Sequence, residues 1–403
     1  MYVWFIYYEQ NRLKLYSIMN KQLPNLNGLR FIAAAAVLLY HVNIALVMTG
    51  LKPTAYTYFP FGFGEFAVVL FFVLSGFLIT WLLLLEKEHT EIDVKKFYLK
   101  RVLRIWPLYY LILAVSFLYF NNSCYFYWPG VTNDINMTAH PVIYPLLLLI
   151  LCPNIAMLDV RTLGYANPTW SIGVEEQFYL IWPLIIKRTN PIKYVVGILV
   201  IVFMLSCGTL DYFLIKATTH HFIVNKTLIN LIFHVSKFFT FNYSFKIDSM
   251  AIGALGAFAA KQKKELLKYI FSIPFQIVLY IITIALLMFP HIVIYQLYSL
   301  VFIIIILNLA FNPNTIVKLE NKIFDYLGRI SYGLYIFHSL TIIPVIHLVT
   351  RLGLRIGLQT ELLIDMICMC ITIGIASVSY RYFESYFLRM KSRLSKKTFK
   401  PVN

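Results

Sequence analysis

Two ionisable side chains stand in the first long apolar stretch of the chain, residues 29–49: Arg30 at its beginning and His41 near its middle. Eleven residues turn an α-helix through about 1,100°, or three turns plus about 20°, so both side chains point the same way, about 16 Å apart along the axis. Imidazole is the side chain most often used for proton transfer, and ionisable groups inside a membrane usually mark a working site. The alternative is that Arg30 anchors the helix at the lipid headgroups while His41 bonds to a neighbouring helix.

Two further arginines, Arg101 and Arg104, are predicted to open the helix that contains another apolar stretch, residues 103–120. At a spacing of three residues they share one face of a helix. Together with Arg30 they would form a site for a polyanion, because the guanidinium group presents a fixed fork of donors that fits phosphate. The alternative is ordinary positive charge at a membrane surface, which is how we interpret the lysines of residues 95–100.

Two adjacent carboxylates, Glu175 and Glu176, follow Trp170 in a third apolar stretch, roughly 8 Å along the helix. Neighbours on a helix point about 100° apart, so at most one of them faces a given cavity. Glu175 shares a face with Ser171 and Tyr179, four residues away on either side. Glu176 would instead bond to the backbone near the helix start, as acidic residues of a first turn do. Adjacent acids in a membrane helix are costly, which favours a functional role for at least one of them.

A polar stripe of Ser331, Tyr335 and His338 recurs at i, i+4 and i+7, so it faces protein rather than lipid. Hydrogen bonding between helices is enough to explain it, and we prefer that interpretation. Asp248 is an isolated acid at the start of another apolar stretch. The five cysteines lack the spacing of metal ligands, so we expect no metal site.

The candidate residues would have to be positioned by membrane-spanning helices, and the composition predicts such helices. Of the 403 residues, 60% are hydrophobic and 13% are charged, about half of the roughly 25% that soluble proteins carry. A surface that faces water needs more charge than this, so the chain is predicted to be an all-α integral membrane protein. The net charge of +17 would suggest nucleic acid binding in a soluble protein. Here it is better explained by basic cytoplasmic loops, and we expect no nucleic acid partner.

The apolar stretches predict about ten membrane crossings, with both termini cytoplasmic. One stretch, residues 141–158, is ambiguous because its prolines break helices. If it stays on the outer side as a re-entrant or peripheral segment, 27 of the 35 Lys and Arg residues fall inside, as the positive-inside rule requires. The predicted crossings are 29–49, 66–85, 103–120, 169–186, 192–210, 247–260, 270–290, 291–311, 330–350 and 361–380.

The chain divides into three parts. Residues 1–25 are predicted to be a cytoplasmic segment, of which 1–18 has the features of a mis-assigned start, because Met19 begins a more conventional sequence. Residues 26–387 form the transmembrane domain, and residues 388–403 form a basic cytoplasmic tail. We expect no soluble domain beyond the last crossing.

The chain resembles the acyltransferase-3 family, integral-membrane O-acyltransferases of bacterial surface sugars, from about Leu26 to Phe387. Arg30 and His41 match the family's Arg/Lys-x10-His signature, and Arg101 and Arg104 match its Arg-x-x-Arg signature. The further matching segments are 71–79, Trp170-Ser171 with 174–179, 245–253, 330–338 and 379–384; Gly173 stands where the family more usually has Ser. Any one of these is weak, but their common order makes the signal specific.

The resemblance implies an acyl-CoA co-substrate, usually acetyl-CoA, that enters from the cytoplasm, with no permanently bound cofactor. It implies a sugar hydroxyl as acceptor, in a surface polysaccharide or glycolipid, and a multi-pass protein of the plasma membrane. CoA phosphates at the three arginines could place the thioester near His41, which would act as general base toward the acceptor hydroxyl. Glu175 would orient the imidazole or hold the acceptor. Trp170, Ser171, Glu176, Asp248, Ser331, Tyr335 and His338 are candidate supporting residues.

Alternatives remain at this point. A transporter or flippase for lipid-linked sugars would also have ten helices and buried polar groups. The acceptor, the length of the acyl chain, a covalent intermediate and the oligomeric state are all open.

Overall fold

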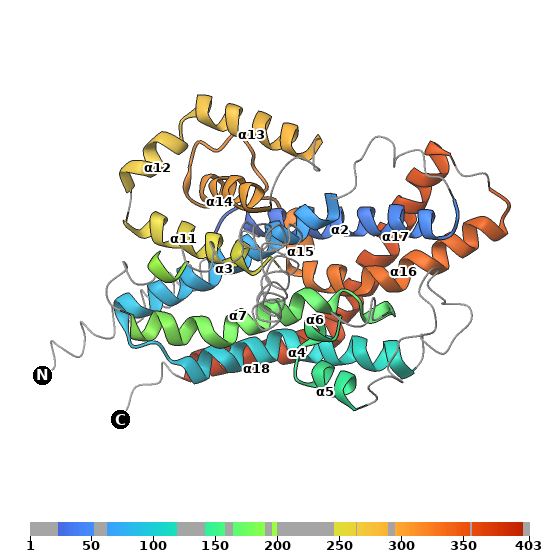
Figure 1. Cartoon of the computed structure of the whole chain (residues 1–403), viewed down its shortest axis with the longest axis horizontal. Helices are drawn as coiled ribbons and strands as arrows, with labels where there is room; N and C mark the ends of the chain where they lie inside the picture. The colour runs from blue at the N-terminus through green and yellow to red at the C-terminus, as the bar shows by residue number, and fades with distance from the viewer. Residues whose placement is uncertain are drawn as a thin grey trace, which may run out of the picture.

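The computed structural model describes residues 23–51, 63–118, 142–157, 164–189, 196–199, 246–262, 264–288, 295–354 and 357–397. Every regular element in these ranges is helical, as the composition predicts (Figure 1). Five helical segments are long and apolar enough to cross a membrane. They are α2 (Leu26–Met48), α3 (Phe63–His89), α4 (Val94–Leu118), α16 (Ser331–Arg351) and the continuous segment Leu358–Lys391.

Four further helices coincide with other predicted crossings. They are α7 (Thr169–Arg188), α11 (Ile247–Gln262), α13 (Ile273–Met288) and α14 (Tyr295–Phe311). Two of them, α13 and α14, are shorter apolar helices. Most of the predicted crossing 192–210 lies outside the described residues. The ten crossings and the cytoplasmic position of both termini therefore stay predictions.

The ambiguous segment 141–158 could be either a crossing or a re-entrant segment from its sequence. It contains two short helices, α5 (Ile143–Leu149) and α6 (Pro153–Ala156). Seven residues of helix are about 10 Å long, too short for a hydrocarbon layer of about 30 Å. Leu151, between the two helices, has a positive φ of 58°. The segment therefore does not form a single spanning helix.

Gly173 of α7 allows α6 to lie directly against this helix. A Cβ at Gly173 would press on the side chain of Asn154. Asn154 and Gln177 exchange side-chain hydrogen bonds of 3.0 and 3.1 Å beside the contact. The glycine that departs from the family's usual serine is thus explained by this close approach.

The central helix α3 packs against α2, α7, α11 and α14. Its contact with α11 is the closest, because a Cβ at Gly76 would overlap the carbonyl oxygen of Met250, and one at Gly253 would overlap that of Val73. Small residues permit such approach of two backbones in a membrane. α3 and α11 therefore pack backbone against backbone.

α4 begins at Val94, nine residues before the predicted stretch 103–120. The expectation that Arg101 opens this helix is therefore wrong, because Arg101 and Arg104 lie about two and three turns inside it. Its first turns are amphipathic, with Phe97 buried and Lys95 exposed, so a search for apolar residues alone misses them.

The last crossing continues past its predicted end. α17 (Leu358–Ser379) passes through a π-helical turn, η7 (Tyr380–Glu384), into α18 (Ser385–Lys397), which runs along α4 (Figure 1). The residues that we predict to form a basic tail, from 388 onward, thus begin inside a helix. A separate cytoplasmic tail from 388 onward stays a prediction.

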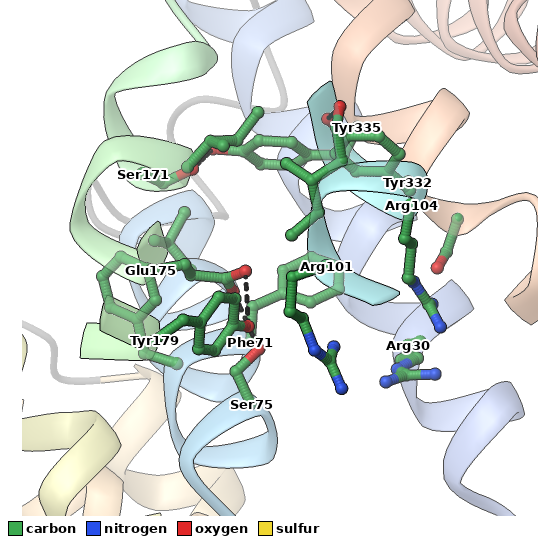
Figure 2. A pocket seen from close by; sticks show the side chains of 15 residues that line it. Arg30, Phe71, Ser75, Arg101, Arg104, Ser171, Glu175, Tyr179, Tyr332 and Tyr335 are labelled. Carbon is green, nitrogen blue, oxygen red and sulfur yellow. Dashed lines mark hydrogen bonds between the residues drawn. The ribbon is translucent and has the colours of Figure 1, made fainter. Parts of the chain in front are cut away.

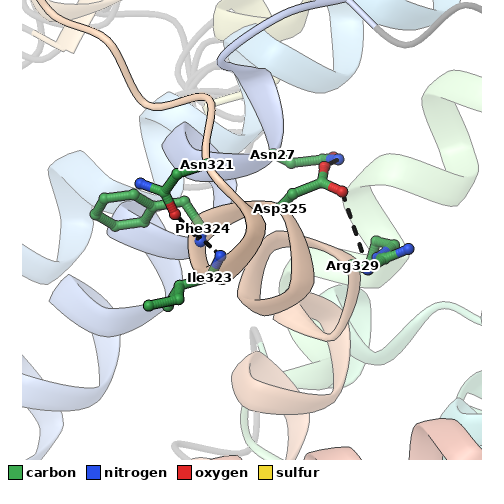
Figure 3. A network of polar contacts seen from close by, with 6 residues as sticks. All are labelled: Asn27, Asn321, Ile323, Phe324, Asp325 and Arg329. Atoms are coloured by element: carbon green, nitrogen blue, oxygen red, sulfur yellow. Dashed lines mark hydrogen bonds and ion pairs between the residues drawn. The ribbon is translucent and has the colours of Figure 1, made fainter.

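A short helix, α15 (Lys322–Arg329), fixes the beginning of α2 (Figure 3). Asn321 caps it by accepting hydrogen bonds from the backbone N–H groups of Ile323 and Phe324, at 3.0 and 2.9 Å. Asn27 of α2 donates to Asp325 at 2.6 Å. Because Asn27 is three residues before Arg30, this bond sets where that arginine enters the bundle.

Candidate active site

A pocket lies between α2, α3, α4, α7 and α16, with about 750 Å³ of space, part of it open to solvent. Figure 2 shows three arginines on one side of it and Glu175 with Tyr179 on the other. Fifteen residues line the pocket: Arg30, Val68, Phe71, Phe72, Ser75, Arg101, Arg104, Ile105, Ser171, Ile172, Glu175, Tyr179, Ser331, Tyr332 and Tyr335. Seven of the twelve candidate site residues are therefore brought together.

The three arginines come from two helices, Arg30 from α2 and Arg101 with Arg104 from α4, and their charges interact with one another. The guanidinium of Arg101 lies 5.4 Å from the ring centroids of both Phe97 and Tyr179. Its Nε is buried without a hydrogen-bond partner among the described residues. Within the residues that the structure describes, none of the three arginines forms an ion pair within 4.0 Å. Three cations at one pocket without a paired carboxylate suit a ligand with several negative charges.

Glu175 faces the pocket, and both of its carboxylate oxygens are held. Ser75 of α3 donates to one at 2.8 Å, and Tyr179, one turn along α7, donates to the other at 2.9 Å. The predicted common face of Ser171, Glu175 and Tyr179 is confirmed, since all three line the pocket.

Glu176 points elsewhere, which answers the question of which acid faces the pocket. It accepts a hydrogen bond from the indole Nε1 of Trp106 on α4, at 3.1 Å. The predicted bond to the helix backbone is wrong, because Glu176 lies in the second turn of α7, where the amides already donate along the helix. Its other oxygen is buried without a partner among the described residues.

Two hydroxyls meet at the end of the pocket opposite the arginines (Figure 2). The Ser171 and Tyr335 oxygens are 2.7 Å apart, and they join α7 to α16. Ser331 and Tyr335 both line the pocket, and His338 is buried on the same helix. The predicted stripe therefore faces protein, as expected.

His41 does not line the pocket with Arg30; it lies beside His338, with 4.8 Å between the ring centroids. The His338 ring is in turn 5.9 Å from the ring of Tyr335, which does line it. The Nδ1 of His41 bonds to the Val37 carbonyl at 2.8 Å, and that of His338 to the Tyr335 carbonyl at 2.6 Å. A carbonyl accepts only, so we assign the proton to Nδ1 in both rings. The Nε2 of each ring is left as a proton acceptor.

Trp170 and Asp248 lie outside the pocket lining. The Trp170 ring packs edge-on against Phe72, 6.1 Å between centroids, and so supports a residue of the pocket wall. Asp248 accepts a hydrogen bond from Gln296 of α14 at 2.7 Å. Asp248 is thus a buried contact between helices.

Sequence reasoning missed two features of this region. One is Ser75, whose hydroxyl holds Glu175. Lys246 forms an ion pair of 3.5 Å with Glu65, which also accepts a hydrogen bond from Tyr295. The segments 71–79 and 245–253, which carry the family resemblance, contain Ser75 and Lys246 and could have pointed to them.

Comparison with known proteins assigns the family. A family model described as an acyltransferase domain matches residues 23–381. The chain is 31% identical over 168 residues to the peptidoglycan O-acetyltransferase OatA of Listeria monocytogenes, which covers 40% of this chain and 24% of that protein. It is 29% identical over 201 residues to the O-acetyltransferase OatA of Staphylococcus aureus, 48% of this chain and 30% of that protein.

A viral relative matches over a greater length. The putative acetyltransferase ORF330 of Acidianus two-tailed virus is 25% identical over 369 residues, 88% of this chain and 94% of the viral protein. The two bacterial relatives are matched over less than a third of their own lengths. No solved structure matches the chain. Because the family model covers nearly the whole chain, the protein belongs to the acyltransferase-3 family of membrane acyltransferases.

Proposed function

We propose that this protein is a membrane O-acetyltransferase that uses acyl-CoA, with acetyl-CoA as the first donor to test, and a carbohydrate hydroxyl as acceptor. The observation that carries the proposal is the pocket itself. Three arginines, which form no ion pair with a carboxylate among the described residues, line one side, and Glu175 lies across from them (Figure 2). A polyanion with a reactive end fits this division of charge.

The arginines support a nucleotide thioester as donor. Coenzyme A carries a diphosphate and a 3′-phosphate at one end and its thioester at the other, joined by a long thin arm. Guanidinium groups bind phosphate through two parallel hydrogen bonds, and the buried Nε of Arg101 is an available donor. With the phosphates at Arg30, Arg101 and Arg104, the thioester would reach toward Ser171 and Tyr335.

His41 would supply the base for the chemical step, with the acceptor hydroxyl approaching from the side of His338, because His41 lies outside the pocket lining. Its Nε2 would take the proton of the acceptor hydroxyl as the oxygen attacks the thioester carbonyl. The C–O bond forms, the C–S bond breaks, and the thiolate of coenzyme A leaves and is protonated. The hydroxyls of Ser171 and Tyr335 are candidate donors to the carbonyl oxygen, on which negative charge develops. Glu175 would hold the acceptor or order the pocket through Ser75 and Tyr179.

The acceptor class rests on the relatives. The Listeria monocytogenes relative is named as a peptidoglycan O-acetyltransferase, so we propose a glycan polymer or a glycolipid as acceptor. The predicted topology would put the arginines toward the cytoplasm and the acceptor on the outer face of the plasma membrane. Membership of an acyltransferase family does not favour the transporter alternative.

The experiment is acyl transfer by the purified protein in detergent, with acetyl-CoA labelled in the acetyl group and with muropeptides or lipid-linked sugars as acceptors. We expect base-labile label on the acceptor and release of free coenzyme A. A protein that binds these glycans but leaves no acetyl group on any of them would contradict the proposal. Mass spectrometry of surface glycans from cells with and without the protein would then identify the natural acceptor.

A further inference from the structure

The C-terminal helix α18 presents one face to α4, and Lys391 stands on that face. Along η7 and α18, Glu384 is buried and Phe387 and Lys391 are half-buried, at i, i+3 and i+7. Tyr386 and Arg389 are exposed on the other side. A helical period of 3.6 residues puts the first three side chains on a common face. α18 runs along α4 (Figure 1), and because the less exposed side of a helix is the one that meets its neighbours, we assign this face to the contact with α4.

The ammonium of Lys391 lies within the electrostatic reach of the pocket's arginines. Its strongest charge interaction is with Arg104, followed by Arg101, Lys100 and Arg30. All of these are cations, so the interactions are repulsive. Lys391 does not itself line the pocket, but α18 packs on α4, the helix that carries two of the pocket's three arginines. A bound polyanion would turn this repulsion into attraction.

We propose that Lys391 is a fourth phosphate-binding residue of the donor site and that α18 forms a wall of it. The inference rests on the proposed function, since it takes the phosphates of a nucleotide thioester as the ligand. Arg30 and the α4 arginines approach those phosphates from the bundle, and Lys391 would approach from the C-terminal helix. An anionic lipid headgroup offers the same phosphate chemistry, and the experiment separates the two sources.

The test compares Lys391→Gln with Arg389→Gln. Both substitutions remove one positive charge from α18, but Arg389 is exposed. The affinity for coenzyme A is measured by calorimetry in a neutral detergent without lipid. We expect Lys391→Gln to weaken binding roughly tenfold or more, as the loss of one charged hydrogen bond would. Arg389→Gln should bind like the wild type, and Lys391→Arg should restore most of the affinity.

Two further readouts exclude a structural effect. Pantetheine, which lacks the phosphates, should lose no affinity in Lys391→Gln. The unfolding midpoint of ligand-free Lys391→Gln should be close to that of Arg389→Gln, because both variants lose one charge from α18. A lower midpoint with unchanged affinity for coenzyme A would make Lys391 a packing residue and overturn the inference.

The remaining outcomes separate this inference from the function on which it rests. If the wild type binds coenzyme A and Lys391→Gln binds it equally well, Lys391 is not a donor ligand, whereas the function stands. If the variant differs from the wild type only in binding phosphatidylglycerol added to the micelles, Lys391 contacts lipid and the inference is wrong. If the wild type itself does not bind coenzyme A, the proposed function fails first.

Discussion

The Ser75 hydroxyl donates a hydrogen bond of 2.8 Å to the Glu175 carboxylate, joining α3 to α7 at the wall of the pocket. Tyr179 holds the second oxygen of the same carboxylate at 2.9 Å. A carboxylate with both oxygens held cannot rotate freely, so it presents its remaining lone pairs in a fixed direction. Glu175 is therefore pre-oriented before any substrate arrives.

Glu175→Gln should reduce acyl transfer by about 10²-fold, because an amide cannot accept both hydrogen bonds and carries no charge. Glu176→Gln is the matched control: it has the same chemistry one residue away, but its side chain points to Trp106. Initial rates of acetyl transfer at saturating donor compare the two. Equal losses of rate in both variants would show that the position of Glu175 at the pocket makes no specific contribution to catalysis.

His41→Gln should lower the transfer rate by about 10²–10⁴-fold while binding of coenzyme A is unchanged. Glutamine keeps approximate size and hydrogen bonding but takes no proton at neutral pH. His89→Gln is a suitable control, because the Nδ1 of His89 also bonds to a carbonyl four residues earlier, at 2.9 Å, while its side chain is exposed. Near wild-type transfer by His41→Gln would make His41 structural.

Arg104→Ala should weaken donor binding by about 1.5–3 kcal/mol, the worth of one charged hydrogen bond. Arg104→Lys should recover only part of this, because an ammonium lacks the planar fork of donors. Arg329→Ala serves for comparison, since Arg329 lies 3.9 Å from Asp325 on α15 and outside the pocket lining. Calorimetry with coenzyme A measures all three, and unchanged affinity in both Arg104 variants would remove this residue from the donor site.

The predicted topology can be tested with single cysteines in a cysteine-free protein. Cysteines at positions 190, 264 and 320 should react only from the cytoplasmic side, whereas those at 132 and 230 should react with an impermeant maleimide added outside. This pattern follows from the distribution of basic residues. Labelling of position 190 from outside would contradict this topology, because every later helix would then have the opposite orientation.

Gly76→Ala should lower thermal stability, because the new methyl group would overlap the Met250 carbonyl and force α3 away from α11. Overpacking of this kind costs about 1–3 kcal/mol. Gly374→Ala is the control: Gly374 lies in α17 with nothing within 4 Å of its added Cβ, so the substitution should be neutral or slightly stabilising. The unfolding midpoints in detergent compare the two, and equal midpoints would mean that the α3–α11 contact yields easily.

Spacing within one helix predicted which side chains of that helix share the pocket, whereas it could not predict hydrogen bonds between helices. The i, i+4 rule placed Ser171, Glu175 and Tyr179 on one face, and the structure confirms it. The bond from Ser75 to Glu175 depends on the register of α3 against α7, which no spacing within either helix contains. The bond between Trp106 and Glu176 has the same origin.

Arg30 and His41 show that two residues on the same face of a helix need not belong to the same site. A common face does not mean a common pocket, because eleven residues separate the two side chains by about 16 Å. Arg30 lines the pocket, whereas His41 lies one side chain beyond Tyr335, next to His338. The early start of α4 was missed for a related reason: its first turns are recognised by an amphipathic pattern and not by apolar length.

The backbone contact between α3 and α11 has a mechanical consequence for turnover. α3 is also tied to α7, where Trp182 donates to Thr80 at 2.8 Å and Lys87 donates to the Ile186 carbonyl at 2.5 Å. These three helices therefore resist sliding, and Ser75, next to Gly76, shares their rigidity. α4 is held to the same group, because its Trp106 donates to Glu176 of α7. Glu175 would therefore keep its position during turnover, and a donor would have to fit beside it without separating α3 from α11.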